Sequence, residues 1–381
     1  MVPTPQVKAK LEAVGFVQQI EVDPCLFISD KVICVCFVDD SLLFARNRSD
    51  IDDVITQLTG PKHNMKLEAE DSVAGFLGVH IDRNEATGEI TLTQRGLIDR
   101  IIDALQIEGL PAVSTPATGP LGKDEFGDPP NGTFSCPSVI GMLWYLTKHS
   151  RPELSFACSQ VARYTFNPKR SHELALIRIG QYLKSTRDKG LILKPTDFDK
   201  QGFTMDIYVD SDFCGRFGSD EPTNPDNVRS RAGYVICVNN CPITWNSKLM
   251  DPICLSTMMA EYYALSMSMR EVLPLRDLVR TVGRGIKIDD KVMSTFKVTI
   301  WEDNMGALTL ANLDPGHNTP RSRHYDSKVH HFRQYLNRES DGPGNQITVE
   351  SISTERQPAD LMTKALDRQT FERLRKLIMG W

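Results

Sequence analysis

The stretch Val32-Ile33-Cys34-Val35-Cys36-Phe37-Val38-Asp39-Asp40-Ser41-Leu42-Leu43-Phe44-Ala45 contains two short apolar runs that are separated by a pair of acids. Two such runs predict a β-hairpin that carries the carboxylates of Asp39 and Asp40 at its tip. Carboxylates at a tip can hold a divalent cation, because Mg²⁺ takes oxygen ligands and usually shares one or two carboxylates with a phosphate substrate. The stretch therefore indicates polymerase chemistry, with an ordinary hairpin and an acidic turn as the alternative.

The size and composition of the chain indicate a globular protein with more than one domain. Its 381 residues are too many for one ordinary core and predict two domains or three. Hydrophobic residues make up 40% of the sequence and charged residues 24%, and we find no low-complexity tract or internal repeat. These values exclude a disordered chain.

The sequence predicts an intracellular protein without a membrane partner, and it does not distinguish the cytoplasm from the nucleus. Residues 1–5 do not begin a signal peptide, and no run approaches the roughly 18 apolar residues of a membrane span. The nine cysteines include no CxxC pair. We therefore expect reduced, mostly buried thiols rather than disulfides or a zinc site.

The net charge of −5 argues against a protein that coats nucleic acid by electrostatics alone. It does not exclude a nuclease or a polymerase, because clustered metal-binding acids lower the net charge while local basic stripes still reach phosphates. One candidate stripe, for which a solvated helix face is the alternative, comprises Lys169, Arg170, Arg178, Lys184, Arg187 and Lys189.

Hydrophobic spacing divides the first half of the chain into hairpins and helices. Helices are expected over residues 7–14, 50–59 and 96–105, and a second hairpin over residues 76–93. Residues 111–137, rich in Pro, Gly and Ser, form the first clear linker. Two further helices are expected at about residues 138–165 and 171–186.

From residue 205 onward the spacing changes to that of strands. Three strands joined by short turns come first, followed by a long helix and then by a strand, helices, a strand and a last helix. The expected strands cover residues 206–210, 231–238, 243–245, 297–301 and 347–352, and the expected helices residues 256–282, 305–313, 324–336 and 359 onward. This order predicts a mixed five-stranded sheet covered by helices.

Four acids fall at strand ends or on helices of this second region. Asp210 closes the first strand, Asp303 follows the fourth, and Asp360 lies in the first turn of the last helix. Glu261 lies on the long helix, where apolar neighbours at i+3 and i+4 place it on the inward side. An ionised carboxylate that points at a core must be paired or bound to a metal. The four acids are therefore predicted to converge at one edge of the sheet.

Three of the four acids also have an ordinary interpretation, and Glu261 is the hardest to explain in such a way. Asp360 is a favourable charge at a helix N-terminus, Asp303 a cap or turn residue, and Asp210 part of an acidic loop with Asp212. Convergence has a chemical purpose, however, because four carboxylates in one pocket repel one another and call for cations. Two Mg²⁺ ions about 3.5 to 4 Å apart would activate a water and stabilise the leaving oxygen of a phosphodiester. The pattern therefore favours hydrolysis of a nucleic-acid backbone.

Taken in order, these residues resemble the polymerase region of Ty1/copia-type LTR retrotransposons, in which a reverse transcriptase is followed by a ribonuclease H. Phe37-Val38-Asp39-Asp40 is similar to the family's YVDD-type motif, with Phe in place of Tyr, and Phe76-Leu77-Gly78-Val79 looks like its primer-grip hairpin. Leu92-Thr93-Gln94 resembles the start of its thumb, and Ser114-Thr115-Pro116 resembles its linker. The resemblance covers nearly the whole chain.

The second half continues this resemblance. Tyr208-Val209-Asp210-Ser211-Asp212 looks like the first ribonuclease H strand, and Ala260-Glu261-Tyr262, Glu302-Asp303-Asn304 and Ala359-Asp360-Leu361-Met362-Thr363-Lys364 follow in the family's order. The resemblance implies that the catalytic, metal-binding acids are Asp210, Glu261, Asp303 and Asp360, with Asp212 as the reserve candidate for the first position. It implies that Asp39 and Asp40 bind metal in the polymerase motif.

The resemblance also implies a fold and a function. The fold class would be α+β and α/β, with a partial reverse-transcriptase palm and thumb over residues 1–110, a linker and connection helices over 111–204, and a ribonuclease H-like domain over 205–381. The implied enzyme is a ribonuclease H-type endonuclease that uses Mg²⁺, or Mn²⁺, to cut RNA in RNA–DNA hybrids. Its partners would be hybrid and DNA, together with other retroelement Pol or Gag products.

One departure concerns the implied RNA-directed DNA polymerase. The family's polymerase needs a further Asp from an upstream palm strand, and it needs fingers that bind the nucleotide. Asp23 and Asp30 precede Asp39, but neither stands in that motif, so an incomplete polymerase site is expected. Two alternatives stay open: a catalytically inert relic or repurposed nucleic-acid-binding protein, and a chain completed by another polypeptide.

Overall fold

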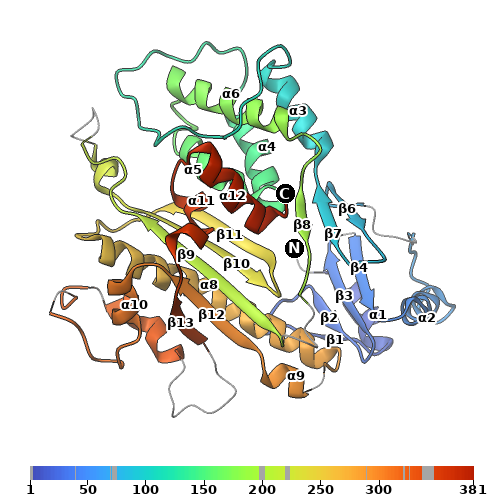
Figure 1. Cartoon of the computed structure of the whole chain (residues 1–381). Helices are drawn as coiled ribbons and strands as arrows, with labels where there is room; N and C mark the ends of the chain where they lie inside the picture. The colour runs from blue at the N-terminus through green and yellow to red at the C-terminus, as the bar shows by residue number, and fades with distance from the viewer. Residues whose placement is uncertain are drawn as a thin grey trace. The chain divides into compact units, whose positions relative to one another are not determined.

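The computed structural model describes residues 3–38, 40–68, 70, 75–196, 202–218, 224–288, 290–320, 322–325, 327–336 and 347–381. The chain divides into two compact units, one formed by Met1–Ser72 with Arg270–Phe296 and the other by Val73–Met269 with Lys297–Trp381. The strands of the described residues form three sheets, which are accompanied by helices (Figure 1). The predicted mixture of helix and sheet is confirmed, whereas the division into palm, thumb and ribonuclease H parts stays a prediction. Among the described helices, none combines the length and the apolar character needed to cross a bilayer.

The first unit contains the hairpin that was expected over residues 32–45. β3 (Val32–Phe37) pairs antiparallel with β4 (Asp40–Ala45), and Phe37 lies opposite Asp40. The alternation of side chains along β3 buries one face of the hairpin. The other elements of this unit are β1 (Val17–Gln18), β2 (Leu26–Ile28), α1 (Pro5–Ala13), α2 (Arg48–Thr59) and α9 (Asp290–Ser294). The helix α8 (Thr257–Gly285) is divided between the two units, and its part from Arg270 onward belongs to this one.

A four-stranded antiparallel sheet opens the second unit. It contains the second predicted hairpin, formed by β6 (Val79–Arg83) and β7 (Ile90–Thr93), with β5 (Gly75–Phe76) beside β6. The fourth strand, β8 (Leu191–Leu193), pairs with β7 although it follows much later in the chain. Local spacing did not predict β8, because a three-residue strand shows too little alternation.

Helices bury a large apolar core in the second unit. They are α3 (Arg95–Leu105), α4 (Cys136–His149), α5 (Ser155–Ala162), α6 (Arg170–Ser185) and α12 (Arg368–Met379). The single helix expected at about residues 138–165 is instead divided into α4 and α5 by a short 3-10 helix at Pro152–Leu154. Pro152 explains the division, since proline disfavours the helical conformation of the preceding residue and cannot donate a backbone hydrogen bond.

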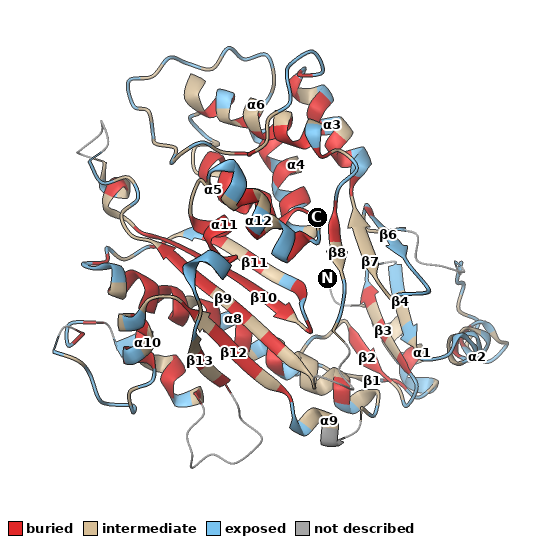
Figure 2. Ribbon diagram, viewed as in Figure 1, coloured by how far each residue is buried: buried red, intermediate tan, exposed pale blue. Residues whose placement is uncertain are grey.

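The predicted mixed five-stranded sheet is confirmed, with the strand order β11-β10-β9-β12-β13. β9 (Thr204–Asp212), β10 (Arg231–Val238) and β11 (Cys241–Leu249) are antiparallel neighbours. β12 (Lys297–Glu302) runs parallel to β9, and β13 (Ile347–Ser351) runs parallel to β12. The central strands β9 and β10 are largely buried (Figure 2).

Short helices pack against this sheet. α11 (Asp360–Thr363) contacts β9, β10 and β11, and α10 (Met305–Ala311) contacts β12 and β13. The helix expected over residues 324–336 is a 3-10 helix at Ser327–Tyr335. α11 is the element that matters most below, because it brings residues from near the C-terminus onto the end of β9.

Candidate metal centre

Three of the predicted acids meet at one end of the five-stranded sheet. β9 and β12 are parallel neighbours whose last paired residues are Tyr208 and Trp301. Two residues further along the chain come Asp210 and Asp303, so their carboxylates lie at the same edge. Glu261, in the second turn of α8, brings the third carboxylate. One carboxylate oxygen of each acid lies within 4.8 Å of the other two.

The donor set fits a hard divalent cation. Asp210 and Glu261 are buried and Asp303 is half-buried. Within the described parts of the chain, nothing donates a hydrogen bond to Oε2 of Glu261, or to Oε2 of Glu302, the fully buried last residue of β12. A buried carboxylate oxygen without a donor has lost hydration that a cation can replace, and such oxygens are the ligands that Mg²⁺ prefers.

The pKa values of these acids show how strongly the site disfavours negative charge. Burial raises the pKa of Asp210 to about 7, with Lys364 opposing the shift. Burial first, and then the neighbouring carboxylates of Asp210, Glu302 and Asp303, raise the pKa of Glu261 to about 11. The pKa of Glu302 rises to about 8, again chiefly by burial. Without a metal the site therefore holds protons that a divalent cation would displace.

The fourth predicted acid, Asp360, joins the site through a lysine. Lys364 Nζ lies 2.8 Å from Asp360 Oδ1 and 3.2 Å from Asp210 Oδ1. The hydroxyl of Thr363 donates a hydrogen bond to Asp210 Oδ2. Burial lowers the pKa of Lys364, but Asp210 and Asp360 outweigh burial and raise it above its ordinary value. The structure thus brings together Asp210, Glu261 and Asp303 directly, and Asp360 by way of Lys364.

A buried glutamine ties together the two strands that carry Asp210 and Asp303. Gln357 Nε2 donates to the carbonyl oxygen of Val209, at 2.8 Å, and to that of Trp301, at 3.3 Å. Its side chain is fully buried. Gln357 is therefore a positioning residue, because it fixes the spacing of β9 and β12 next to their acids.

Reasoning from the sequence assigned no role to Glu302, Gln357, Thr363 or Lys364. Lys364 carried a local signal, since an acid and a lysine at i and i+4 lie on the same side of a helix. Glu302 also carried one, because an acid within a strand buried on both faces needs a partner. Asp212, the reserve candidate, is half-buried and is not one of the three mutually close acids.

Comparison with known proteins identifies relatives of the chain. No protein-family model matches it. It is 26% identical over 371 residues to the retrovirus-related Pol polyprotein of transposon TNT 1-94 from Nicotiana tabacum, which covers 93% of this chain and 25% of that protein. Its homologues are Ty1/copia-type retrotransposon Pol polyproteins.

Two further relatives agree with this lineage. The Pol polyprotein of transposon RE1 from Arabidopsis thaliana is 25% identical over 373 residues, which are 96% of this chain and 23% of that protein. The transposon Ty1-DR5 Gag-Pol polyprotein of Saccharomyces cerevisiae is 24% identical over 371 residues, 92% of this chain and 19% of that protein. The chain therefore spans about a quarter, or less, of the length of these Pol relatives.

Of the two acids expected at the tip of the β3–β4 hairpin, Asp39 and Asp40, the structure describes one. Asp40 is exposed at the start of β4, two residues after Val38, whose φ of 55° is rare for a branched side chain. Asp39 lies outside the described residues. The polymerase motif therefore stays a prediction.

The side chains of the predicted basic stripe form hydrogen bonds, ion pairs and a ring contact with other residues of the chain. Lys169, Arg178 and Lys184 bond to the segment that leads from α3 to α4, and Arg187 forms an ion pair with Asp99 of α3. Arg170 forms an ion pair with Glu173, and Lys189 lies over the Trp381 ring. These contacts anchor the linker on α6, so the stripe is neither a simple solvated face nor a row of uncommitted phosphate ligands.

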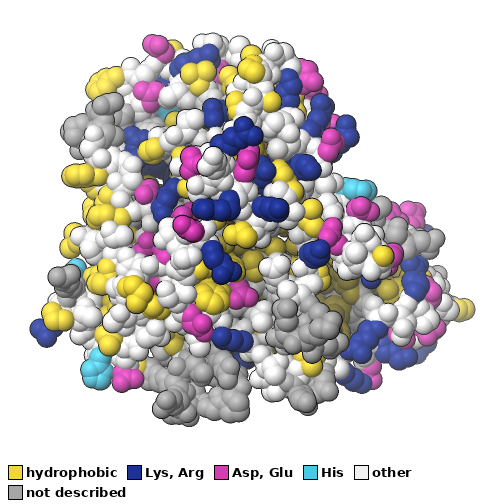
Figure 3. Space-filling view, in the orientation of Figure 1, with side chains coloured by type: hydrophobic (Ala, Val, Ile, Leu, Met, Phe, Trp, Pro, Cys, Tyr) yellow, Lys and Arg dark blue, Asp and Glu magenta, His cyan; other side chains and the backbone are white. Residues whose placement is uncertain are grey.

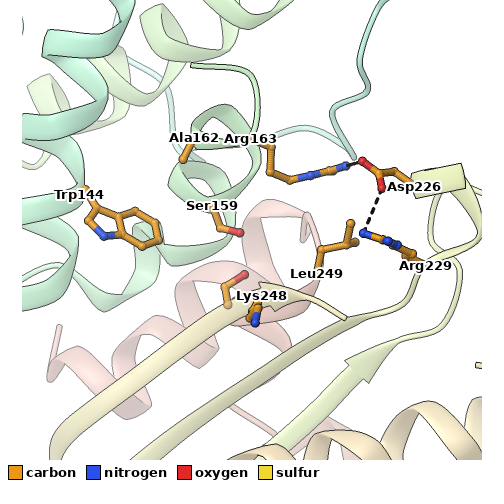
Figure 4. Close-up of a pocket in the computed structure, with 9 residues that line it drawn as sticks. Trp144, Ser159, Ala162, Arg163, Asp226, Arg229, Lys248 and Leu249 are labelled. Carbon is orange, nitrogen blue, oxygen red and sulfur yellow. Dashed lines mark hydrogen bonds and ion pairs between the residues drawn. The ribbon is translucent and has the colours of Figure 1, made fainter. Parts of the chain in front are cut away.

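A cavity of about 350 Å³ lies between α4, α5 and β11 (Figure 4). Asp226 in its wall forms ion pairs with Arg163, at 2.5 Å, and with Arg229, at 3.4 Å. The remaining lining residues are Trp144, Ser159, Ala162, Ser247, Lys248 and Leu249. Through the β9–β10–β11 register, Ser247 and Asp210 both lie opposite Gly233, so the cavity opens near the same end of the sheet as the acids.

Proposed function

We propose that this chain is a retroelement ribonuclease H that hydrolyses the RNA strand of RNA–DNA hybrids with Mg²⁺, or with Mn²⁺ in its place. The observation that carries the proposal is the convergence of Asp210, Glu261 and Asp303 within 4.8 Å from three separate elements. A bound divalent cation would supply Lewis-acid activation for phosphodiester hydrolysis. The homology to retrotransposon Pol polyproteins supports a substrate of this class.

The chain's own residues would have distinct tasks in this reaction. Asp210, Glu261 and Asp303 would hold the cation with carboxylate oxygens, and Asp360 would face the same phosphate from α11. The Thr363 hydroxyl would orient Asp210 through their hydrogen bond. Preorganised groups of this kind need little rearrangement when charge develops in the transition state.

Basic side chains near the acids support a nucleic-acid substrate. α12 follows α11 and carries Arg368, Arg373 and Lys376 as exposed cations. Figure 3 shows Lys and Arg side chains gathered over α11 and α12 on the face drawn. Such groups would bind the backbone of an A-form-like duplex through its phosphates, largely independent of sequence.

Cleavage of a labelled RNA–DNA hybrid by the purified chain in Mg²⁺ tests the proposal. We expect Asp303→Asn and Glu261→Gln to reduce the rate by about 100-fold or more, since even indirect supports of a metal ligand typically contribute 10- to 100-fold. Asp210→Asn should behave in the same way. Two matched controls, Asp212→Asn and Asp40→Asn, should retain most of the activity.

Two results would reject the proposal. Cleavage that is unchanged in Asp303→Asn and Glu261→Gln would place the activity elsewhere. An inert relic or repurposed binding protein would show no cleavage, and its melting temperature would not respond to Mg²⁺ or Mn²⁺ beyond a control of equal ionic strength. Parallel assays on RNA–RNA and DNA–DNA duplexes would show whether the hybrid is preferred.

A further inference from the structure

A lysine ammonium lies between two acids of the candidate metal centre. Lys364 Nζ is 2.8 Å from Asp360 Oδ1 and 3.2 Å from Asp210 Oδ1, and the Lys364 side chain is only 34% exposed. Asp360 and Lys364 stand four residues apart, and the Lys364 backbone N–H donates to the Asp360 carbonyl oxygen at 3.1 Å. This local turn fixes the direction in which the lysine extends.

The position of the ammonium differs from that of the three mutually close acids. Asp210, Glu261 and Asp303 form one set of oxygens, whereas the carboxylate of Asp360 is absent from that set and is bridged to the carboxylate of Asp210 by Lys364. Asp210 is thus shared between two places, one lined by Glu261 and Asp303 and the other by Asp360. Among the described residues, no Lys or Arg side chain lies between the oxygens of the first place, whereas the Lys364 ammonium lies in the second.

Two positive charges cannot both occupy the place between Asp210 and Asp360. Mg²⁺ requires oxygen ligands at about 2.0 to 2.1 Å in nearly octahedral geometry. The Lys364 ammonium already donates hydrogen bonds to the same two carboxylates, so an ion there would have to expel it.

We propose that the Lys364 ammonium takes the place of a second cation, so that the centre binds one divalent ion, at Asp210, Glu261 and Asp303. The inference rests on the metal centre of the proposed function, and it proposes one ion where two were expected from the sequence. An ammonium has three N–H donors. Two of them bond to Asp210 and Asp360, and the third would be directed at a phosphate oxygen of the bound strand.

Counting bound ions on the full chain tests this inference without relying on activity. We would titrate the chain with Mn²⁺ by calorimetry and record the electron paramagnetic resonance of the bound ions, since two Mn²⁺ about 4 Å apart couple magnetically. We expect one ion and an uncoupled spectrum for the wild-type chain. Lys364→Met should bind two ions and show the coupled spectrum, because the second place is vacated.

A charge-preserving variant and a stability measurement complete the test. Lys364→Arg should still bind one ion. In EDTA, Lys364→Met should melt at a lower temperature than the wild-type chain, and saturating Mn²⁺ should raise its melting temperature by more than that of the wild type. A variant that does not fold would be replaced by Lys364→Gln, which is judged by the same ion count.

The outcomes separate this inference from the proposed function. Two ions in the wild-type chain, or one ion in both the wild type and Lys364→Met, would overturn the inference. Hybrid cleavage by a wild-type chain with two ions would leave the proposed function standing. A wild-type chain that binds one ion, gains a second in Lys364→Met and does not cleave the hybrid would overturn the proposed function alone.

Discussion

Gly233 lies directly opposite Asp210 in the antiparallel β9–β10 ladder, and α11 packs onto it without room for a side chain. A Cβ atom at Gly233 would overlap Cβ of Met362 and would come within 2.8 Å of Cγ2 of Thr363. Because α11 carries Asp360 and Thr363, this close approach of helix and strand sets the distance between Asp210 and its partners.

We predict that Gly233→Ala weakens the metal centre although it changes none of the acids. The added methyl group would push α11 away from β10 and so lengthen the contacts that Thr363 and Lys364 make with Asp210. Overpacking of this kind costs about 1 to 3 kcal/mol of folding stability. Thermal melting and a Mn²⁺ titration would measure the two effects.

Gly141→Ala is the matched control for Gly233→Ala. Gly141 lies exposed within α4, and a Cβ there would meet no atom within 4 Å. Alanine is the better helix former by roughly 1 kcal/mol, so this variant should be as stable as the wild type or slightly more stable. Equal Mn²⁺ affinity in the wild type and Gly233→Ala would show that α11 does not control the site.

The buried acids predict that the metal-free chain loses stability as the pH rises. Asp210 and Glu302 have folded-state pKa values raised from 3.8 to about 7 and from 4.5 to about 8. A raised pKa means that the folded state keeps a proton that the unfolded state releases. This stabilising contribution is complete below the ordinary pKa and is lost as the pH rises through the folded-state value.

The expected observation is a melting temperature in EDTA that falls between about pH 4 and pH 8, with Glu261 adding to the trend at higher pH. Mg²⁺ competes with these protons, so the gain in melting temperature on adding Mg²⁺ should grow with pH. Lys364 faces the same acids and limits the effect. Glu302→Gln should flatten the fall in EDTA, and a slope that this variant leaves unchanged would contradict the assignment.

The parts of the second unit that depend on the spacing of residues along the sequence could be predicted. Alternation along β9 and the order of strands and helices predicted the five-stranded sheet, because that order is typical of a mixed sheet covered by helices. Glu261 was predictable as a buried acid, because its apolar neighbours at i+3 and i+4 reveal which side of α8 faces inward. The convergence of Asp210, Glu261 and Asp303 followed from these two inferences.

The features that could not be predicted depend on contacts between segments that lie far apart in the sequence. The pairing of β8 with β7 joins Leu191 to Leu92, and no local pattern specifies that register. The contact of Lys364 with Asp210 requires α11 to lie on β10 at Gly233, which is a matter of packing and not of spacing along the chain. The division of α4 from α5 was signalled by Pro152, but the apolar spacing on both sides masked it.

A buried ion pair at this division provides the last prediction. Arg151 and Glu153 are both fully buried, with Arg151 Nε donating to Glu153 Oε1 at 2.6 Å. The guanidinium also donates to the backbone carbonyl and the hydroxyl of Thr186, at 3.2 and 2.6 Å, and Tyr182 donates to Glu153. Arg151 thereby joins the end of α4 to the end of α6.

We predict that Arg151→Met destabilises the second unit by about 3 to 5 kcal/mol, because it leaves the Glu153 carboxylate buried and unpaired. The double variant Arg151→Met with Glu153→Leu should recover much of this loss, since no buried charge then lacks a partner. Arg187→Met, which breaks the more exposed ion pair with Asp99, is the control and should cost about 1 kcal/mol or less. Melting curves of the wild type, Arg151→Met, the double variant and Arg187→Met would test this prediction. A double variant as unstable as Arg151→Met would mean that the bonds to Thr186, and not the unpaired carboxylate, account for the loss of stability.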